Sequence, residues 1–489
     1  MNRNLTSLGR SSDAEPSFDY VLLTGATGLV GQYLIKDLLL AGQRLAVIVR
    51  PARRLNVGQR VELILRRWEA ELECLLPRPV VLQGDVSEPD LGLSPADAQW
   101  VKTHCHRVIH NAAILQFDGA DREAEPWRTN LGGTRHVLKL LGEMESLREF
   151  HYVSTAYVCG QREDLVCEAD LDLGQEFRND YERSKFESEK LVRSLEGSFS
   201  TTIYRPAVIV GDSKTGFTST YHGLYMYLRL LATLVPEQKR NAEGVIETPI
   251  RLPMQGDEPR NLVPVDWVSQ VMTRLFLDPE SHGLTFHLVP DTFVTARKVI
   301  EAGYEYFNST GVVFCGPSDV RSKDNEFSAK YFENVKTYES YETSDPTFDF
   351  SNLKKFVSDL PCPEITQEVI LKFMDFGVRD RWGKSRPKSP ADVDWIGGQS
   401  DAILRAVADV ASDDFCIGID LLGPGGGQWA LQQKAGEVSL DRGCPSMPSV
   451  LQWVTDESGE MADGRPEITV SELKSSMFWS EQIHSFRGD

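Results

Sequence analysis

Residues 21–31, Val-Leu-Leu-Thr-Gly-Ala-Thr-Gly-Leu-Val-Gly, decide the fold of this chain. A short apolar run leads into three glycines spaced three apart, Gly25, Gly28 and Gly31, and a helical pattern follows over residues 32–40. We predict a strand, a tight turn and a helix. Gly25 permits the turn, Gly28 lets the backbone approach a pyrophosphate, and Gly31 lets the helix pack closely on the strand.

The N-terminus of that helix completes the predicted site. Backbone N–H groups around Thr27, Leu29 and Val30 are expected to face the phosphates of a dinucleotide. The spacing is Gly-x-x-Gly-x-x-Gly rather than Gly-x-Gly-x-x-Gly, and glycine-rich turns also occur without a ligand. The rest of the chain must therefore decide whether the turn binds a nucleotide.

Strands and helices alternate along the chain after this turn. The further strands expected in the main sheet are residues 45–49, 80–82, 108–110, 150–153, 201–204 and 286–289. Such alternation predicts an α/β fold, a doubly wound parallel Rossmann-type sheet with helices on both faces. In such sheets ligands bind at the carboxyl ends of the strands.

Small and polar residues follow several of these strands. We expect the residues at these strand ends to contact the dinucleotide: Asp85, Val86, Asn111, Ala112, Ala113, Pro206 and Val208. Arg50 follows the second strand, and Arg60 lies near the start of the next helix. A basic residue at this point accommodates the extra phosphate of NADP, whereas NAD sites place an acidic residue there. The alternative is a solvated basic turn.

Tyr181 and Lys185 carry the predicted chemistry. Four residues apart on a helix, they share one face, so the ammonium lies beside the phenol or the nicotinamide ribose. A tyrosine with an ordinary pKa of about 10 becomes an effective acid–base group when a nearby cation stabilises its phenolate. Thr155, after the strand over residues 150–153, would hydrogen-bond the same carbonyl oxygen that Tyr181 protonates.

Composition and charge exclude several classes of function. The formal net charge is −20, which argues against a nucleic-acid partner. The polar start and the lack of a long apolar segment predict a cytoplasmic protein without a transmembrane span. The eight cysteines are expected to be free thiols, and the pattern His104-Cys105-His106 with His110 lacks a second ligand cluster, so we predict no metal.

The expected domains are residues 18–290, an NADP-binding domain with substrate elements from about 211–260, and a helical substrate-binding subdomain over 291–383. A linker over 384–391 precedes a small α+β domain at 392–489. The apolar helix over 223–235 is expected to be core, to wall a greasy pocket or to rest on a membrane surface.

At this point the chain resembles the extended short-chain dehydrogenase/reductase superfamily over roughly residues 20–290. It is most similar to the thioester-reductase branch, which includes fatty acyl-CoA reductases of the male-sterility type. The stretches that carry this likeness are 151–158 (His-Tyr-Val-Ser-Thr-Ala-Tyr-Val), 179–185 (Asn-Asp-Tyr-Glu-Arg-Ser-Lys) and 204–216, which begins Tyr-Arg-Pro. Arg50 and Arg60 also fall where that branch places its NADP-phosphate arginines.

The resemblance implies NADPH-dependent reduction of an acyl thioester to an aldehyde, with reduction onward to the alcohol left open. Thr155, Tyr181 and Lys185 would be catalytic, and Thr155 is favoured over Ser154 by its register from Gly160, as in sugar epimerases of the superfamily. The thioester would come from CoA or a separate acyl carrier protein. Residues expected to contact the substrate are Ser154, Gln116, Gly211, Ser213, Tyr221 and Met226.

Two other functions stay open. The same triad serves ketone or alcohol oxidoreductases and epimerases acting on steroids, isoprenoids or sugar nucleotides, and a non-catalytic NADP-binding protein is the third possibility. Residues 392–489 lie outside the likeness. Their pattern around 427–431 resembles a sterol-carrier-type lipid-binding module, with an oligomerisation or lid domain as the alternative. The oligomeric state is not predicted.

Overall fold

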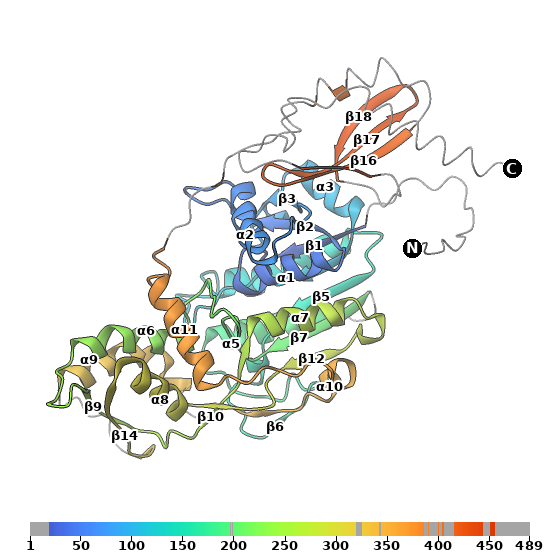
Figure 1. Cartoon of the computed structure of the whole chain (residues 1–489). Helices are drawn as coiled ribbons and strands as arrows, with labels where there is room; N and C mark the ends of the chain where they lie inside the picture. Colours follow the sequence, from blue (N-terminus) through green and yellow to red (C-terminus); the bar gives the residue numbers. More distant parts are fainter. Residues whose placement is uncertain are drawn as a thin grey trace.

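A seven-stranded parallel sheet forms the centre of the molecule (Figure 1). The computed structural model describes residues 19–195, 197, 199–318, 325–341, 344–385, 390, 400, 403–404, 415–443 and 450–454. The sheet has the order β3-β2-β1-β4-β5-β7-β12. Its strands are β1 (Tyr20–Thr24), β2 (Arg44–Val49), β3 (Val80–Gln83), β4 (Cys105–His110), β5 (Glu149–Val153), β7 (Ser200–Pro206) and β12 (Thr285–Leu288). All seven predicted strands are confirmed.

Both faces of this sheet are buried, because its strands are apolar at successive positions. Val21 and Leu23 of β1 join the core on one face, and Tyr20 and Leu22 join the core on the other. The first face is covered by α1 (Leu29–Leu40), α2 (Val57–Leu72), α7 (Val265–Phe276) and α10 (Ser351–Val357). The second is covered by α3 (Pro95–His104), α4 (Gly133–Gly142) and α5 (Asp180–Arg193). This is the doubly wound architecture that the alternation predicts.

Strand order reverses at β1, which pairs with β2 on one side and β4 on the other. The glycine turn therefore lies at the topological switch point, where open α/β sheets bind ligands. Helix α1 begins at Leu29, three residues before the predicted start, because Gly28 is its N-cap. A π-helical turn, η2 (Arg128–Gly132), precedes α4.

A second group of elements packs beside the carboxyl ends of the sheet and is seen at the lower left of Figure 1. It comprises α6 (Leu224–Leu234), η4 (Val235–Glu237), β9 (Ile246–Leu252), α8 (Ala296–Phe307), β14 (Ser309–Phe314), α9 (Glu326–Val335), η6 (Lys336–Tyr341) and α11 (Gln367–Arg379). The subdomain over residues 291–383 is expected from the sequence to be helical, and this is wrong for β14, which pairs in parallel with β9. Its run Ser-Thr-Gly-Val-Val-Phe is rich in β-branched residues, which favour strands.

Short strand pairs and turns link the two groups. The pairs are β6 (Leu165–Val166) with β15 (Thr347–Phe348), β8 (Val208–Val210) with β11 (Leu262–Pro264), and β10 (Pro259–Arg260) with β13 (Val294–Thr295). The remaining short helices are η1 (Pro89–Gly92), η3 (Ala156–Cys159) and η5 (Pro279–Ser281). Helix α10 returns to the main sheet, so the chain crosses between the two groups more than once.

The described part of the C-terminal region is a four-stranded mixed sheet: β16 (Phe415–Leu422), β17 (Gly427–Lys434), β18 (Glu437–Arg442) and β19 (Val450–Val454). It touches the main domain through Tyr20, whose hydroxyl donates to Gln428 at 2.7 Å, and through the Asp97–Arg442 ion pair at 2.8 Å. Most of the predicted linker lies outside the described residues. Within the part of the chain that the structure describes, no helix is both long and apolar enough to cross a bilayer.

Candidate functional site

The glycine turn has the geometry of a phosphate cradle. Gly25 adopts a φ of +70°, and a Cβ there would stand 2.7 Å from the backbone nitrogen of Ala112. A Cβ on Gly31 would lie 2.1 Å from the Gly25 carbonyl oxygen, so only glycine allows this close packing of α1 on the turn. No side chain caps the N-terminus of α1, and Gly28, Leu29 and Val30 border a cavity of about 700 Å³. The Gly28 N–H donates to the Gly25 carbonyl at 3.0 Å, so the N-terminus that borders the cavity begins at Leu29, and such a helix N-terminus suits a pyrophosphate.

The end of β4 is bonded to this turn. The Asn111 side-chain amide donates to the Gly25 carbonyl at 3.2 Å, and the Ala112 backbone N–H donates to the Thr24 hydroxyl at 3.2 Å. His110 lies 2.7 Å from the same hydroxyl. These bonds fix the spacing between the ends of β1 and β4, beside the cavity.

Two arginines border the cavity where β2 ends. Arg60 donates to the Thr27 hydroxyl at 3.0 Å and to the backbone carbonyl of Arg50. Burial and the neighbouring Arg50 both lower the pKa of Arg60. The Arg50 side chain is 59% exposed, and its nearest carboxylate, Asp85, is 3.9 Å away. Two cations held this close together favour an anion between them.

Thr155 and Tyr181 meet deeper in the cavity. Thr155 follows β5 and caps η3, accepting the Tyr157 N–H at 3.3 Å. Tyr181 stands in the first turn of α5, where the Asn179 side chain caps the helix by accepting from Glu182. Burial raises the pKa of Tyr181 to about 12, although a hydrogen bond from Thr155 opposes that rise. Tyr181 is therefore a protonated donor at neutral pH.

Lys185 lies one helical turn after Tyr181 and is fully buried. Its ammonium donates to the Val153 carbonyl at 2.8 Å and to the Tyr152 hydroxyl at 3.0 Å. Burial lowers the pKa of Lys185 to about 7, against the attraction of Glu189. A fixed amine near its midpoint at neutral pH responds strongly to any charge placed beside it.

Ser154 differs from its neighbour Thr155 in what it bonds. Its hydroxyl donates to Glu189 at 2.6 Å, and Glu189 forms a fully buried ion pair with Arg205 at 2.6 Å. Burial alone would raise the pKa of Glu189, but the charges of Arg205 and Arg193 hold it below its usual range. Ser154 and Arg205 therefore form the support beneath the site, and Thr155 is the hydroxyl beside Tyr181.

The cavity continues beyond Tyr181 into a chamber with apolar and aromatic walls. Its lining there comes from α6, β9 and the turn after it, α8, α9 and η6: Leu224, Tyr227, Leu231, Leu252, Met254, Val299, Ile300, Tyr331, Tyr338 and Tyr341. The apolar helix over 223–235 thus packs into the core and also walls the chamber. One continuous space joins the phosphate cradle, the Thr155–Tyr181 pair and this chamber.

Aromatic residues that the sequence reading missed close one side of this chamber. Phe117, in the loop after β4, packs against Tyr338 and Tyr341 with ring centroids 5.0 and 5.3 Å apart. Tyr341 also donates to Glu182 at 2.8 Å and accepts from Asn179 at 2.8 Å. Segment η6 is thereby fixed to the start of the helix that carries Tyr181. Two tyrosines three residues apart, at 338 and 341, indicate one aromatic face. The local sequence does not show which part of the molecule that face contacts.

The predicted cofactor residues border this cavity with one exception. Those that line it are Gly25, Thr27, Gly28, Leu29, Val30, Arg50, Arg60, Asp85, Val86, Asn111, Ala112, Ala113, Tyr181, Lys185, Pro206 and Val208. Gly31 lies behind the turn, where its packing role is visible.

The predicted substrate residues fare differently, since only Ser154 among the six borders the cavity. Gln116 donates to the Asp118 and Glu125 carbonyls, and Ser213 donates to Asp266 at 2.7 Å. Gly211 donates its N–H to the Tyr225 hydroxyl at 2.9 Å, and Tyr221 donates to Asp380. Met226 packs against an apolar cluster that includes Leu230 and Leu234 of the same helix. These five residues therefore have partners outside the cavity lining.

The histidines around Cys105 do not gather into one cluster. His104 stacks on Trp100 with ring centroids 4.8 Å apart, and His106 lies 3.7 Å from Asp19. His110 bonds Thr24 and Thr134, and burial lowers its pKa to about 3. Cys105 is fully buried, which raises the pKa of its thiol.

A parallel sheet reversing at β1, a glycine cradle at that point and a Thr–Tyr–Lys group at the next strand end define a dinucleotide-binding domain of the short-chain dehydrogenase/reductase type. Comparison with known families agrees. The male sterility protein family, an NAD-binding family, matches residues 23–272, about half of the chain. The chain belongs to this family.

Individual proteins extend this likeness. The chain is 25% identical over 384 residues to a component of the linear gramicidin synthase of Brevibacillus parabrevis, covering 75% of this chain and 7% of that protein. It is 22% identical over 327 residues to the fatty acyl-CoA reductase wat of Drosophila melanogaster, covering 58% and 60%. The chain thus spans less than two thirds of either relative.

Among solved structures, the terminal R domain from the myxalamid PKS-NRPS biosynthetic pathway superposes with a TM-score of 0.59 and 24% identity, over 77% of this chain and 94% of that domain. This likeness shows that the two share a fold.

Proposed function

We propose that this chain reduces an acyl thioester, carried by CoA or by a separate acyl carrier protein, to an aldehyde with NADPH. The observation that supports the proposal most is the position of Thr155 and Tyr181 where the phosphate cradle meets the apolar chamber. A thioester carbonyl placed there would have the cofactor's hydride donor on one side and the apolar chamber, with room for an acyl chain, on the other. The relatives that the chain matches include a fatty acyl-CoA reductase and a linear gramicidin synthase.

The reduced dinucleotide, when bound, supplies the hydride. Thr155 and Tyr181 donate hydrogen bonds to the thioester carbonyl oxygen, which becomes an oxyanion as its carbon is reduced. Tyr181 then gives its proton to that oxygen, and the resulting hemithioacetal collapses to the aldehyde with loss of the thiol. Since burial holds the pKa of Tyr181 at about 12 before any ligand binds, its proton is available at neutral pH.

Lys185 has the position needed to assist. Held by the Val153 carbonyl and the Tyr152 hydroxyl, its ammonium stays within one helical turn of Tyr181. A positive charge there stabilises the phenolate left by proton transfer. In the family pattern this lysine also orients the nicotinamide ribose.

The preference for NADPH is carried by Arg50 and Arg60. Both border the cavity at the end of β2, where dinucleotide-binding folds place the group that contacts the adenosine ribose. Two guanidinium groups with one carboxylate at 3.9 Å suit a 2′-phosphate better than a diol.

The acyl group is proposed to be fatty. Leu231, Leu252, Met254 and Ile300 present only apolar side-chain atoms to the chamber. Burying an acyl chain against such walls contributes about 0.8 kcal/mol for each methylene group. Sugar nucleotides would leave their hydroxyls without partners along these residues.

A thioester panel tests the proposal. Purified protein is mixed with NADPH and acyl-CoAs of increasing length, while NADPH absorbance and free thiol are followed together. We expect thiol release in step with NADPH oxidation, and faster turnover as the chain lengthens toward the size of the chamber. Oxidation of NADPH by ketones with no thiol from any thioester would refute the proposal and favour a ketone oxidoreductase.

A further inference from the structure

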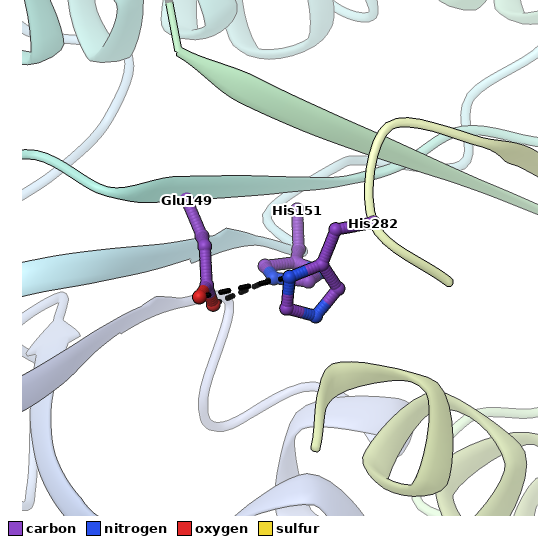
Figure 2. A group of neighbouring side chains, drawn as sticks. All are labelled: Glu149, His151 and His282. Carbon is purple, nitrogen blue, oxygen red and sulfur yellow. Dashed lines mark ion pairs between the residues drawn. The ribbon is translucent and has the colours of Figure 1, made fainter. Parts of the chain in front are cut away.

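A second group of chemically active side chains lies at the amino end of the sheet, away from the cavity. Glu149 and His151 occupy alternate positions of β5, so both point to the same face, and His282 reaches them from the loop between η5 and β12 (Figure 2). One ligand atom from each lies within 4.8 Å of the others. His151 is completely buried, and Glu149 is partly exposed.

Hydrogen bonds identify which histidine nitrogens face the centre of the group. His282 Nε2 lies 3.2 Å from the Phe276 carbonyl oxygen, which can only accept, so Nε2 carries the hydrogen. His282 Nδ1 then faces Glu149 Oε1 at 3.6 Å. His151 Nδ1 bonds the Tyr204 hydroxyl at 2.9 Å, and its Nε2 lies 3.6 Å from Glu149 Oε2 without a hydrogen-bond partner.

This arrangement is typical of a metal site, in which each histidine ligand is held by a hydrogen bond to its second ring nitrogen. Metal-bound histidines usually donate their second ring N–H to a carbonyl or another oxygen, which fixes the ring's tautomer and orientation. Phe276 and Tyr204 provide those oxygens here. With His151 Nδ1 donating to the Tyr204 hydroxyl, the two inward nitrogens and the carboxylate are three electron-pair donors that face one another.

The arginines near Glu149 pair with a different carboxylate, that of Asp19. Arg107, the cross-strand neighbour of Glu149, is held by Asp19 at 3.4 Å, and Arg148 lies 3.8 Å from the same carboxylate.

We propose that Glu149, His151 and His282 bind one divalent transition-metal ion of the zinc type. Zinc–ligand bonds of about 2.0–2.1 Å at a tetrahedral centre place ligand atoms about 3.4 Å apart. Each imidazole lies 3.6 Å from a different oxygen of the Glu149 carboxylate, and one ligand atom from each of the three residues lies within 4.8 Å of the others, so small side-chain rotations bring the three to that spacing. Three protein ligands leave the fourth position to water, which reaches the site beside the partly exposed Glu149.

The ion would tie β5 to the loop that precedes β12, across the intervening strand β7. Its three ligands lie outside the set of residues that line the cofactor cavity. We therefore expect the ion to stabilise the fold and to leave turnover at the cavity unchanged.

The test uses the untagged full chain, freed of metal with a chelator and then titrated with Co²⁺ or Zn²⁺. We expect one equivalent of Co²⁺ to give the visible absorption bands of a tetrahedral site, and Zn²⁺ to displace it and raise the unfolding temperature. Glu149→Gln and His282→Asn should each weaken Co²⁺ binding by at least about tenfold and remove the thermal shift. His104→Asn, a histidine outside the cluster, is the matched control and should behave like the parent chain.

Both variants change partly exposed or loop residues, and circular dichroism of the apo forms verifies that they fold. Absence of a stoichiometric cobalt spectrum in the parent chain overturns the proposal. So does a spectrum that persists unchanged in both variants, because the metal would then lie elsewhere. Thioester reduction is measured in parallel, so loss of the metal site and failure of the proposed reaction are distinguished.

Discussion

Strand β5 joins two sites that differ in their relation to solvent. After its carboxyl end, Thr155 faces a cavity of about 700 Å³ beside a partly exposed Tyr181. Toward its amino end, Glu149 begins the strand and His151, two residues on, is completely buried, with the Phe276 ring centroid 4.8 Å away. The physical reason lies in the sheet: loops diverge at the carboxyl ends around the switch point, whereas the amino ends are covered by the returning connections. The carboxyl end of β5 therefore borders a cavity that can hold a dinucleotide, whereas the side chains near its amino end are packed in the interior.

The strongest test of this contrast is Tyr181→Phe, for which we expect a loss in kcat of at least about a thousandfold, since proton donation to the carbonyl oxygen is removed. Affinity for NADPH should stay within a few-fold, measured by fluorescence titration. Tyr338→Phe, which removes another tyrosine hydroxyl from the chamber wall, is the control and should retain most activity. A near-normal rate in Tyr181→Phe would remove this residue from the mechanism.

The second prediction concerns the cofactor end of the same cavity. Arg50→Ala should weaken NADPH binding by about ten- to a hundredfold and leave NADH binding nearly unchanged, because one charge-assisted contact to the 2′-phosphate is lost. Isothermal titration with both cofactors measures this. Arg53→Ala, an exposed residue of the same loop, is the control. Equal losses for both cofactors would mean that Arg50 reads something other than the phosphate.

A third prediction uses the buried amine. The pKa of Lys185 is about 7 in the folded chain and 10.5 in the unfolded one, so between these values the unfolded chain binds a proton that the folded chain does not. The free energy of unfolding should therefore rise with pH across this window, by up to about 1.4 kcal/mol per pH unit from this group.

Lys185→Met should lack that rise, whereas Lys190→Met, an exposed lysine on the same helix, should keep it. Urea unfolding at several pH values provides the comparison. Parallel curves for the parent chain and Lys185→Met would contradict the shifted pKa.

The smallest effect is expected at the amino end of β1. Tyr20→Phe removes the donor to Gln428 and should lower the free energy of unfolding by about 1 kcal/mol without changing turnover. Arg442→Ala, which breaks an exposed ion pair with Asp97, should cost less. Reduced turnover in Tyr20→Phe would show that the two ends of the sheet are coupled.

Local patterns were enough to predict the sheet and most of the cofactor cradle. The glycine spacing in the run from Val21 to Gly31 predicts a strand, a turn and a helix. The structure shows the positive φ that the turn needs at Gly25 and the close helix packing at Gly31. The prediction of a helical subdomain over 291–383 was wrong at β14, because its short β-branched run becomes a strand by pairing with β9, which is distant in the sequence.

The substrate wall was the part that local patterns missed. Met226 and Tyr227 are neighbours on α6, yet only Tyr227 lines the chamber. Tyr338 and Tyr341 enter the site from more than 150 residues beyond Tyr181. Which side of a helix faces a cavity depends on what packs against its other side, and that partner is distant in the sequence.

The sequence by itself determined the parallel sheet, the glycine cradle, the two arginines and the pairing of Tyr181 with Lys185, because each depends on spacing within one strand, turn or helix. The register from Gly160 already favoured Thr155 over Ser154, and only the tertiary structure gives the reason: Ser154 donates to Glu189, which is paired with Arg205. Tertiary structure alone decided that His282 meets Glu149 and His151. Those contacts join segments that approach one another only when the sheet is assembled.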